Sequence, residues 1–203
     1  MSRKIALIDY GAGNLTSVRK GLEAAGADIY TPATARDVTH AAGIVVPGVG
    51  HFAATASLDG PWRDEILRCV EAGVPLFGIC LGMQWLFDGS TEAAEIPGLG
   101  VFSGLCTRIE APRPLKVPHV GWNTLARSRE SVLLDGVEPA AHVYFTHAYA
   151  APVTSECVAT SEHGVTFAAA VERAHVGGVQ FHPEKSSDAG LRILRNFVRM
   201  VTT

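Results

Sequence analysis

The segment 74–88, with the sequence VPLFGICLGMQWLFD, constrains the fold of this 203-residue chain more than any other feature. Its apolar first half stops at Cys80, which has Gly78 two residues before it and Gly82 two residues after it. Residues at helical spacing follow at once, so the pattern predicts a buried strand, a sharp turn at the cysteine and a helix. The two glycines would allow the turn and leave the approach to the sulfur open.

This arrangement is the cysteine version of a nucleophile elbow, in which the reactive atom lies between a strand and a helix. The start of the helix would direct backbone N–H groups and the positive end of its dipole at Cys80, which favours the thiolate. The alternative is an unreactive buried cysteine beside two packing glycines, because free cysteine is commonly a small core residue. On the first interpretation, Cys80 is the candidate nucleophile.

The rest of the chain predicts an α/β fold. Short apolar runs at 4–9, 28–30, 43–46 and 74–79 alternate with helical patterns at 15–25 and 61–70, which favours a mostly parallel central sheet with flanking helices. In the second half, strand patterns at 101–109, 117–125, 142–149, 158–163, 167–172 and 178–182 predict additional antiparallel strands. An amphipathic helix follows the capping residues 186–188. No linker or repeat interrupts the pattern, so residues 1–203 are expected to form a single domain.

Composition argues against several classes of function. The net charge is −3 without a block of Lys and Arg, which disfavours a nucleic-acid partner. No apolar run reaches the ~18 residues of a membrane span, and residues 5–8, between Lys4 and Asp9, are too few for a signal-peptide core. The four cysteines are scattered without a CxxC pair, which makes a poor disulfide framework and a poor zinc site. We therefore expect a cytoplasmic protein with no metal, no cofactor and no membrane partner.

A thiolate nucleophile needs a base and a group that orients the base. The best candidates lie in the segment 178–184, GVQFHPE, where Pro183 biases His182 toward an extended backbone. Side chains two residues apart in an extended chain face the same way, so His182 and Glu184 are expected to project to one side, imidazole beside carboxylate. A surface turn with a solvated His and Glu is the commoner outcome for such a motif alone, and the cysteine elbow is what favours the catalytic interpretation.

The other motifs carry less information. Of the eight histidines, none of the other seven has a carboxylate at that spacing, and no HExxH pattern indicates a metal. The segment 11–14, GAGN, lacks the third glycine of a dinucleotide loop and the Lys of a P-loop, so nucleotide binding is not expected. The segment 47–50, PGVG, could present an N–H group to an oxyanion together with that of Leu81, or could form only a tight turn.

Two of these segments, GICLGMQ at 78–84 and HPE at 182–184, resemble the class I glutamine amidotransferases, which release ammonia from glutamine with a Cys-His-Glu triad. Within that class, four further segments are similar to the glutaminase subunits of imidazole glycerol phosphate synthases, from histidine biosynthesis. They are IDYGAGNLTSV at 8–18, PGVGHF at 47–52, PHVGWN at 118–123 and QFHPEKS at 180–186. The matches run from residue 5 to residue 186, so the resemblance covers nearly the whole chain.

The resemblance implies a role for each matching position. Cys80 would be the nucleophile, His182 the base and acid, and Glu184 the group that orients His182. The oxyanion donors would be the backbone N–H groups of Val49 and Leu81. The positions that would bind glutamine are Gly50, Gln84, Glu92, Ala148 and Tyr149. The positions that would face a partner are Asn14, Trp122, Tyr144 and Lys185.

One position departs from the family pattern, because Ala148 stands where serine or threonine is expected. A backbone contact to glutamine would be unaffected by this difference. Loss of a hydroxyl contact would weaken the binding of glutamine.

The implied reaction has two parts. The glutaminase part converts glutamine to glutamate and ammonia through a thioester on the cysteine. The family passes the ammonia to a (β/α)8-barrel cyclase subunit, which makes imidazole glycerol phosphate and an aminoimidazole carboxamide ribotide. This chain has no residues for a barrel, so the resemblance implies a heterodimer with a separate cyclase.

Three other functions stay open. An amidotransferase subunit of anthranilate or aminodeoxychorismate synthase would use the same chemistry, although its oxyanion segment is expected to be richer in glycine and proline than 47–50. A non-catalytic interaction subunit of the same fold would lack one of the triad residues, and all three are present. A cysteine hydrolase of the same α/β type, such as a peptidase, would not show glutamine turnover stimulated by a barrel partner.

Overall fold

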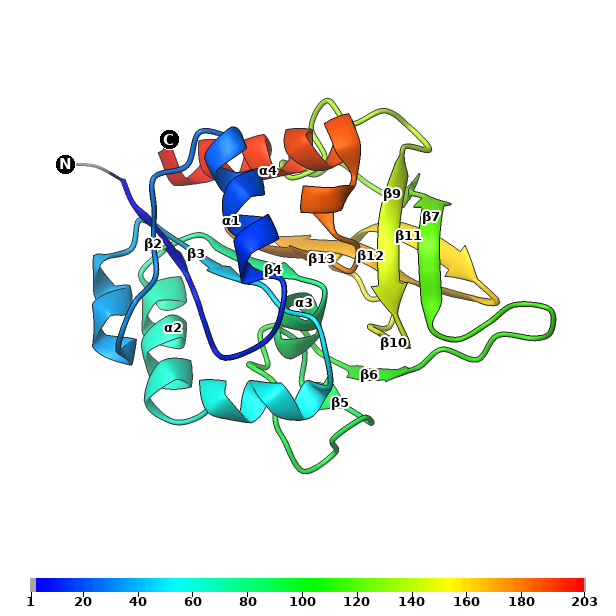
Figure 1. The fold of residues 1–203 in the computed structure, drawn as a ribbon, viewed down its shortest axis with the longest axis horizontal. Helices are drawn as coiled ribbons and strands as arrows, with labels where there is room; N and C mark the ends of the chain where they lie inside the picture. The colour runs from blue at the N-terminus through cyan, green and yellow to red at the C-terminus, as the bar shows by residue number, and fades with distance from the viewer. Residues whose placement is uncertain (1–2, 203) are drawn as a thin grey trace.

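An eight-stranded sheet forms the centre of the molecule (Figure 1). The structure, a computed structural model, describes residues 3–202. The strand order is β2-β1-β3-β4-β13-β12-β11-β8. The first five strands are mutually parallel, and the last three join antiparallel, which confirms the expected fold class. In that order the strands are Ile29–Tyr30, Ile5–Leu7, Gly43–Val46, Leu76–Ile79, Val176–Val179, Val165–Arg173, Cys157–His163 and Ala126–Arg127.

In the described part of the chain, four α-helices cover the two faces of this sheet. Helices α1 (Leu15–Ala24) and α4 (Ser187–Thr202) pack on one face, blue and red in Figure 1. Helices α2 (Pro61–Glu71) and α3 (Leu81–Trp85) pack on the other face. No helix within residues 3–202 is both long enough and apolar enough to cross a membrane.

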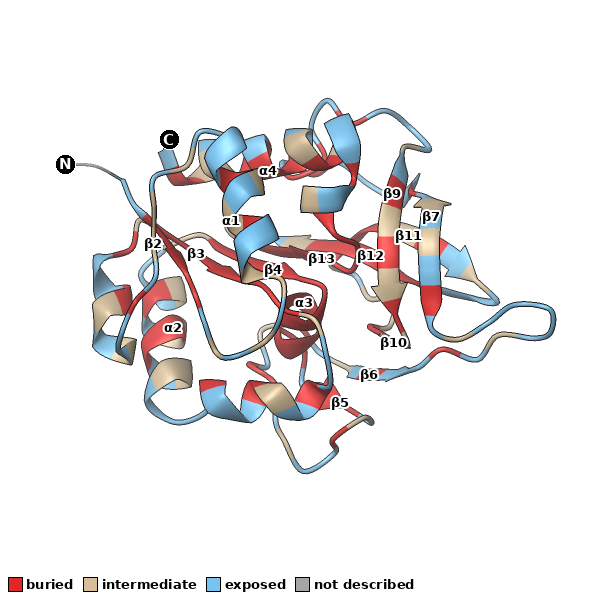
Figure 2. Cartoon of the chain, viewed as in Figure 1, coloured by how far each residue is buried: buried red, intermediate tan, exposed pale blue. Residues whose placement is uncertain are grey.

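Alternation of side chains along the central strands explains the packing on both faces. In and just after β1, Ile5 and Leu7 belong to the core shared with α1 and α4, whereas Ala6 and Ile8 belong to the core shared with α2 and α3. Because successive side chains of a strand point to opposite faces, a strand covered on both sides reads as a continuous apolar run. Figure 2 shows the result, in which the central strands are buried and the outer helix surfaces are exposed.

Two smaller sheets stand beside the main one. Strands β7 (His119–Thr124) and β9 (His142–His147) form an antiparallel ribbon, seen at the right of Figure 1. Strands β5 (Gly89–Ser90), β6 (Leu105–Arg108) and β10 (Tyr149–Ala150) form a three-stranded sheet. The carbonyl oxygen of Tyr144 in β9 accepts a hydrogen bond of 2.9 Å from the N–H of His182, so the ribbon reaches the end of β13.

The structure differs from the sequence prediction in its short elements. Three 3-10 helices were not predicted: η1 (Ala35–His40), η2 (Phe52–Leu58) and η3 (Pro183–Lys185). The predicted strand at 101–109 begins only at Leu105, because the N–H groups of Val101 and Phe102 both bond to the carbonyl of Leu86 and form a turn against α3. The strand predicted at 178–182 ends at Val179.

Candidate active site

Cys80 makes the turn between β4 and α3 with its own backbone. Its φ is 53° and its ψ is −106°, a conformation that non-glycine residues rarely adopt. The N–H of Cys80 donates to the carbonyl of Val179 at 2.8 Å, and its carbonyl accepts from the N–H of Gln84 at 3.1 Å. The residue is 4% exposed. Strain of this kind clusters at functional sites, and here it holds the thiol at the start of a helix.

The two glycines of the elbow act through the space that they leave. Neither Gly78 nor Gly82 has a positive φ, so they allow the sharp turn by their lack of a side chain and not by an unusual backbone conformation. A Cβ on Gly82 would overlap the carbonyl oxygen of Val46, and a Cβ on Gly78 would lie 2.7 Å from that of Gly82. The glycines therefore let α3 pack directly on the ends of β3 and β4.

His182 and Glu184 form a buried pair. The distance between His182 Nδ1 and Glu184 Oε1 is 2.8 Å, and both side chains are 1% exposed. His182 has the extended backbone that Pro183 predicts, with φ −100° and ψ 96°. Glu184, however, lies in the 3-10 helix η3, so the reason given for the pairing, alternation along an extended chain, is wrong for Glu184. The tight turn after Pro183 brings the carboxylate back to the imidazole instead.

Asn14 adds a second donor to the same carboxylate. Its Nδ2 lies 2.5 Å from Glu184 Oε1 and 3.5 Å from His182 Nδ1. Asn14 precedes α1 in a left-handed conformation, with φ 75°, and makes no side-chain cap for the helix. The structure thus joins Asn14 to the triad candidates, while its contact with a partner stays a prediction.

The environment of His182 favours the imidazolium. Burial lowers the pKa of His182, but the neighbouring side chains of Cys80 and Glu184 raise it by more, to about 9. Within residues 3–202, no hydrogen bond reaches His182 Nε2 or Glu184 Oε2, although both atoms are buried. Because Glu184 and Asn14 occupy the Nδ1 side of the ring, Nε2 is the nitrogen left to exchange a proton with a nucleophile or substrate.

The two N–H groups predicted to be oxyanion donors, those of Val49 and Leu81, are not both free. The N–H of Leu81 donates to the carbonyl oxygen of Gly48 at 3.3 Å. In a planar trans peptide the C=O and the following N–H point in opposite directions, so the N–H of Val49 points away from Leu81. The structure therefore brings the two segments together but shows the peptide between Gly48 and Val49 in the orientation that closes an oxyanion site.

Tyr10 supports this loop and was not singled out from the sequence. Its hydroxyl donates to the carbonyl of Pro47 at 2.7 Å, and a Cβ on Gly48 would overlap that hydroxyl. A Cβ on Gly13 would lie 2.9 Å from the Val49 side chain. The segment 9–14 therefore backs the loop 47–50 through Tyr10 and the triad candidates through Asn14. Tyr10 and Asn14 both belong to the segment 8–14, IDYGAGN, whose sequence pattern indicates neither contact.

The residues expected to bind glutamine fall into two groups around the elbow. Gln84 Nε2 donates to the carbonyl of Tyr149 at 2.8 Å. The carbonyl of Ala148 accepts from the N–H of Ile109 at 2.8 Å, which uses one of its two lone pairs. Glu92 Oε2 accepts from the N–H of Phe52 at 2.7 Å, just beyond the loop 47–50.

Gly50, the remaining position expected to contact glutamine, has φ 123°, and a Cβ added to it would meet no atom within 4 Å. This backbone conformation is one that glycine adopts readily. A substitution at Gly50 would strain the loop 47–50 without any clash.

Three of the four residues expected at a partner interface lie on or over the β7–β9 ribbon, whereas Asn14 lies beside Glu184. Trp122 is 52% exposed and packs edge-on against Tyr144, with ring centroids 6.0 Å apart. The Nζ atom of Lys185 lies 5.8 Å above the Tyr144 ring. Val120, on the same strand as Trp122, is 58% exposed. These four side chains form an apolar surface with one positive charge, which we call the ribbon face.

Two other buried histidines lie under the ribbon. His119 Nδ1 and His147 Nε2 are 3.1 Å apart. Burial lowers the pKa of His147 to about 3 and that of His119 to about 4, so both rings are neutral at pH 7. They pack with Phe145 and Phe167 and thus belong to the core rather than to the acid–base chemistry.

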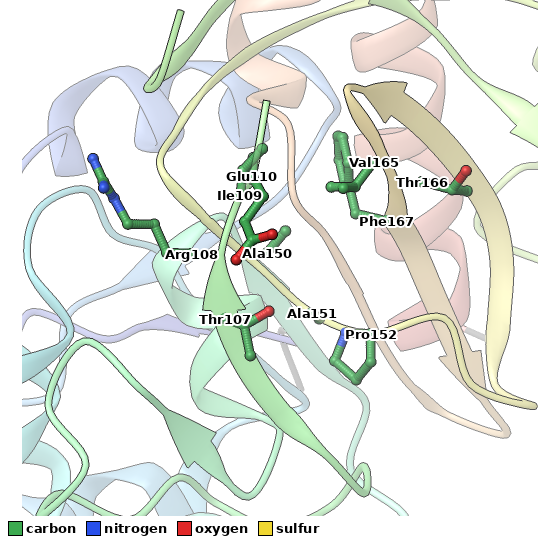
Figure 3. A pocket seen from close by; sticks show the side chains of 10 residues that line it. All are labelled: Thr107, Arg108, Ile109, Glu110, Ala150, Ala151, Pro152, Val165, Thr166 and Phe167. Atoms are coloured by element: carbon green, nitrogen blue, oxygen red, sulfur yellow. The ribbon is translucent and has the colours of Figure 1, made fainter. Parts of the chain in front are cut away.

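A cavity of about 400 Å³ lies between β6 and β12 (Figure 3). Residues 107–110, 150–152 and 165–167 line it, and none of the three triad candidates does. Its wall carries both Arg108 and Glu110. Within residues 3–202, no group of three His, Cys, Asp or Glu side chains is arranged to hold a metal ion.

Comparison with known proteins places this chain in a family. The family model described as "Glutamine amidotransferase class-I" matches residues 6–201. The "Imidazole glycerol phosphate synthase subunit HisH" of Deinococcus radiodurans is 44% identical over 97% of this chain and 93% of its own length. The protein of the same name from Xanthomonas euvesicatoria is 45% identical over 97% of each chain.

Solved structures support the fold independently. A protein described as "Crystal structure of glutamine amidotransferase" superposes with a TM-score of 0.76, at 20% identity, over 98% of this chain and 99% of that one. A glutaminase domain of Trypanosoma brucei CTPS superposes with a TM-score of 0.73, at 16% identity, over 99% of this chain and 94% of that one. The chain therefore belongs to the class I glutamine amidotransferase family and, within it, to the HisH subunits of imidazole glycerol phosphate synthase.

Proposed function

We propose that this chain hydrolyses glutamine with Cys80, His182 and Glu184 and delivers the ammonia to a (β/α)8-barrel cyclase. Its membership of the HisH family makes it the glutaminase subunit of an imidazole glycerol phosphate synthase, in histidine biosynthesis. The assignment of the residues rests on one observation above all. A strained cysteine at a strand–helix junction contacts the end of β13, and the buried histidine two residues beyond that contact is held by a carboxylate.

The triad provides each proton transfer of the reaction. The Cys80 thiolate attacks the side-chain carbonyl carbon of glutamine, and a C–S bond forms as negative charge moves to the oxygen. His182 gives its Nε2 proton to the amide nitrogen, the C–N bond breaks, and ammonia leaves. Water then loses a proton to His182 and attacks the thioester. The C–S bond breaks, which releases glutamate and restores the thiolate.

The oxyanion site must be completed before this reaction is fast. Rotation of the peptide between Gly48 and Val49 would free the N–H of Leu81 and direct the N–H of Val49 toward the same point. Glycines on both sides of Val49 make such a rotation cheap. The hydroxyl of Tyr10, bonded to Pro47, holds the loop in the orientation seen here.

The ribbon face is the proposed docking surface for the cyclase. It is continuous with the triad through backbone hydrogen bonds, because Tyr144 bonds to His182 through its carbonyl and to the Ser186 hydroxyl through its N–H. Lys185 directly follows Glu184. Docking on this face can therefore affect the triad directly, through the hydrogen bonds of Tyr144 and through Lys185. We place the pair in the cytoplasm, where the four free cysteines would stay reduced.

We expect the isolated chain to be a poor glutaminase that the loaded partner switches on. Glutamine hydrolysis should rise by about 10²–10³-fold when the cyclase and its nucleotide ligand are added, the effect typical of one oxyanion donor. The measurement compares the chain alone, the chain with cyclase, and the pair with the ligand. Equal rates in all three conditions would refute control of the oxyanion loop by the partner and leave the triad unaffected.

A second expectation concerns Asn14. Asn14→Ala removes the amide donor from Glu184, so kcat of the complex should fall about 10-fold, as expected for a hydrogen bond to a charged group. KM for glutamine should hardly change, because Asn14 touches none of the glutamine positions. Steady-state kinetics and titration with the cyclase separate the two roles. An unchanged kcat with a weaker affinity for the cyclase would show that Asn14 serves only the interface.

A further inference from the structure

A chain of three hydrogen bonds joins the backbone of Tyr149 to the sulfur of Cys80. Gln84 Nε2 donates to the carbonyl oxygen of Tyr149 at 2.8 Å and to Oε1 of Gln180 at 3.0 Å. Gln180 Nε2 in turn donates to Sγ of Cys80 at 3.6 Å. Gln180 is 0% exposed and Gln84 is 4% exposed, so this polar chain crosses the buried interior of the site.

The backbone determines which way both amides point. A carbonyl oxygen only accepts hydrogen bonds, so the atom of Gln84 beside Tyr149 must be its NH₂ group. The second proton of that group meets Gln180, and the nearest atom of Gln180 must therefore be its oxygen. The NH₂ group of Gln180 is then the part that faces the sulfur of Cys80. The orientation follows from the fixed carbonyl and not from an arbitrary choice between nitrogen and oxygen.

We propose that Gln180 is an additional catalytic residue, which stabilises the Cys80 thiolate by donating a hydrogen bond to its sulfur. A buried anion is costly without donors, and a neutral amide stabilises it without competing for the proton that His182 handles. Gln84 acts on the sulfur one step away, because it fixes the orientation of Gln180. This inference concerns the same site as the proposed glutaminase and rests on that function.

The three hydrogen bonds between Tyr149 and Cys80 also restrict how Gln84 can contact glutamine. Both protons of its NH₂ group are used by Tyr149 and Gln180. Gln84 can therefore contact the substrate only as an acceptor, through Oε1. Tyr149 is itself expected to bind glutamine through its backbone. The same three hydrogen bonds therefore connect β10, which contains Tyr149, with the nucleophile.

The direct test is the reactivity of the sulfur. The full chain is treated with iodoacetamide over a range of pH, and alkylation of the Cys80 peptide is followed by mass spectrometry. In Gln180→Glu, the N–H that faces the sulfur is replaced by a carboxylate oxygen. We expect the pH of half-maximal alkylation to rise by at least about one unit, a tenfold change in the thiolate population. In the complex with cyclase, kcat should fall at least about 10-fold, with little change in KM.

Two further variants define the interpretation. Gln180→Met removes the donor without adding charge and should shift the profile in the same direction, so it carries the test if Gln180→Glu does not fold. Asn196→Asp is the matched control, since Asn196 is a 2%-exposed amide that donates to the carbonyls of Leu133 and Asp135, away from the sulfur. It should leave the alkylation profile of Cys80 unchanged.

A wild-type alkylation profile in folded Gln180→Met would overturn the proposal. A shifted profile in Asn196→Asp as well would also overturn it, because the effect would then reflect a general loss of packing. If the profile shifts only in the Gln180 variants but the wild-type complex fails to hydrolyse glutamine, the role of Gln180 at the sulfur stands and the proposed glutaminase function fails.

Discussion

Cys80→Ala is expected to reduce glutamine hydrolysis by the complex by more than about 10⁴-fold. Without the sulfur there is no acyl acceptor, and the donors and base around it cannot replace a covalent step. The measurement is glutamate release by the complex under saturating glutamine. The substitution removes one sulfur from a position that is 4% exposed, so the fold and binding to the cyclase should persist.

Cys69→Ala is the matched control for this loss. Cys69 is also a free, buried cysteine, but its thiol bonds to the carbonyl of Val38 and lies in the core between α2 and η1. Its variant should keep nearly full glutaminase activity. Added ammonium salt should restore product formation in the Cys80→Ala complex, because only the supply of ammonia is lost. A near-normal rate of glutamine hydrolysis in folded Cys80→Ala would assign the nucleophile elsewhere.

His182→Asn is expected to have the second largest effect, a loss of about 10²–10⁴-fold in kcat. In the proposed mechanism, His182 transfers a proton in both halves of the reaction, whereas Glu184 only orients and stabilises the ring. Glu184→Gln should therefore cost less than His182→Asn. Steady-state kinetics of both variants in the complex provide the comparison. A larger loss in Glu184→Gln, with both variants folded, would reverse the two roles.

The pH dependence of the wild-type complex tests the same assignment. The pKa of His182 is raised to about 9, so the imidazolium persists throughout the neutral range and is lost as the pH rises through about 9. Protonation of the departing ammonia needs that proton. We therefore expect kcat to fall on the alkaline side near pH 9. A fall centred between pH 6 and 7, the range of an unperturbed histidine, would mean that the thiolate and carboxylate do not hold His182 as described.

The parts of the site that could be predicted from the sequence are local. Cys80 lies between an apolar run and a helical pattern, and Pro183 sets the backbone of His182 within one residue. The parallel sheet followed from apolar runs separated by helices, because strands covered on both faces cannot tolerate polar alternation. Such features can be predicted from the few residues on either side of them.

The parts that could not be predicted depend on contacts between distant segments. Asn14 bonds to Glu184, 170 residues away in sequence, and no local pattern around Asn14 indicates an acidic partner. The orientation of the Gly48–Val49 peptide depends on the hydrogen bond that the carbonyl of Gly48, beyond the end of β3, accepts from the N–H of Leu81, beyond the end of β4. Gln180 is an exception, because it lies two residues before His182, and side chains two apart in an extended chain share a face.

The two glycines of the elbow differ in how local their contacts are. A Cβ on Gly78 would meet Gly82 and Met83 of the same elbow, so its role can be predicted from the neighbouring residues. Gly82 allows close approach of α3 to Val46 on a neighbouring strand, which no local pattern indicates. The strain of the turn is carried instead by Cys80, with φ 53°.

The most direct measurement for the central claim is covalent labelling of the complex with a glutamine-mimicking electrophile, followed by mass spectrometry of each cysteine peptide. Burial raises the pKa of the thiols of Cys69, Cys106 and Cys157, which makes them poor nucleophiles. Cys80 instead lies beside an imidazolium and an amide donor. We predict stoichiometric label on Cys80, loss of glutamine hydrolysis in proportion, and protection by excess glutamine. Label on any of the other three cysteines in place of Cys80 would contradict the assignment of the nucleophile and, with it, the proposed glutaminase mechanism.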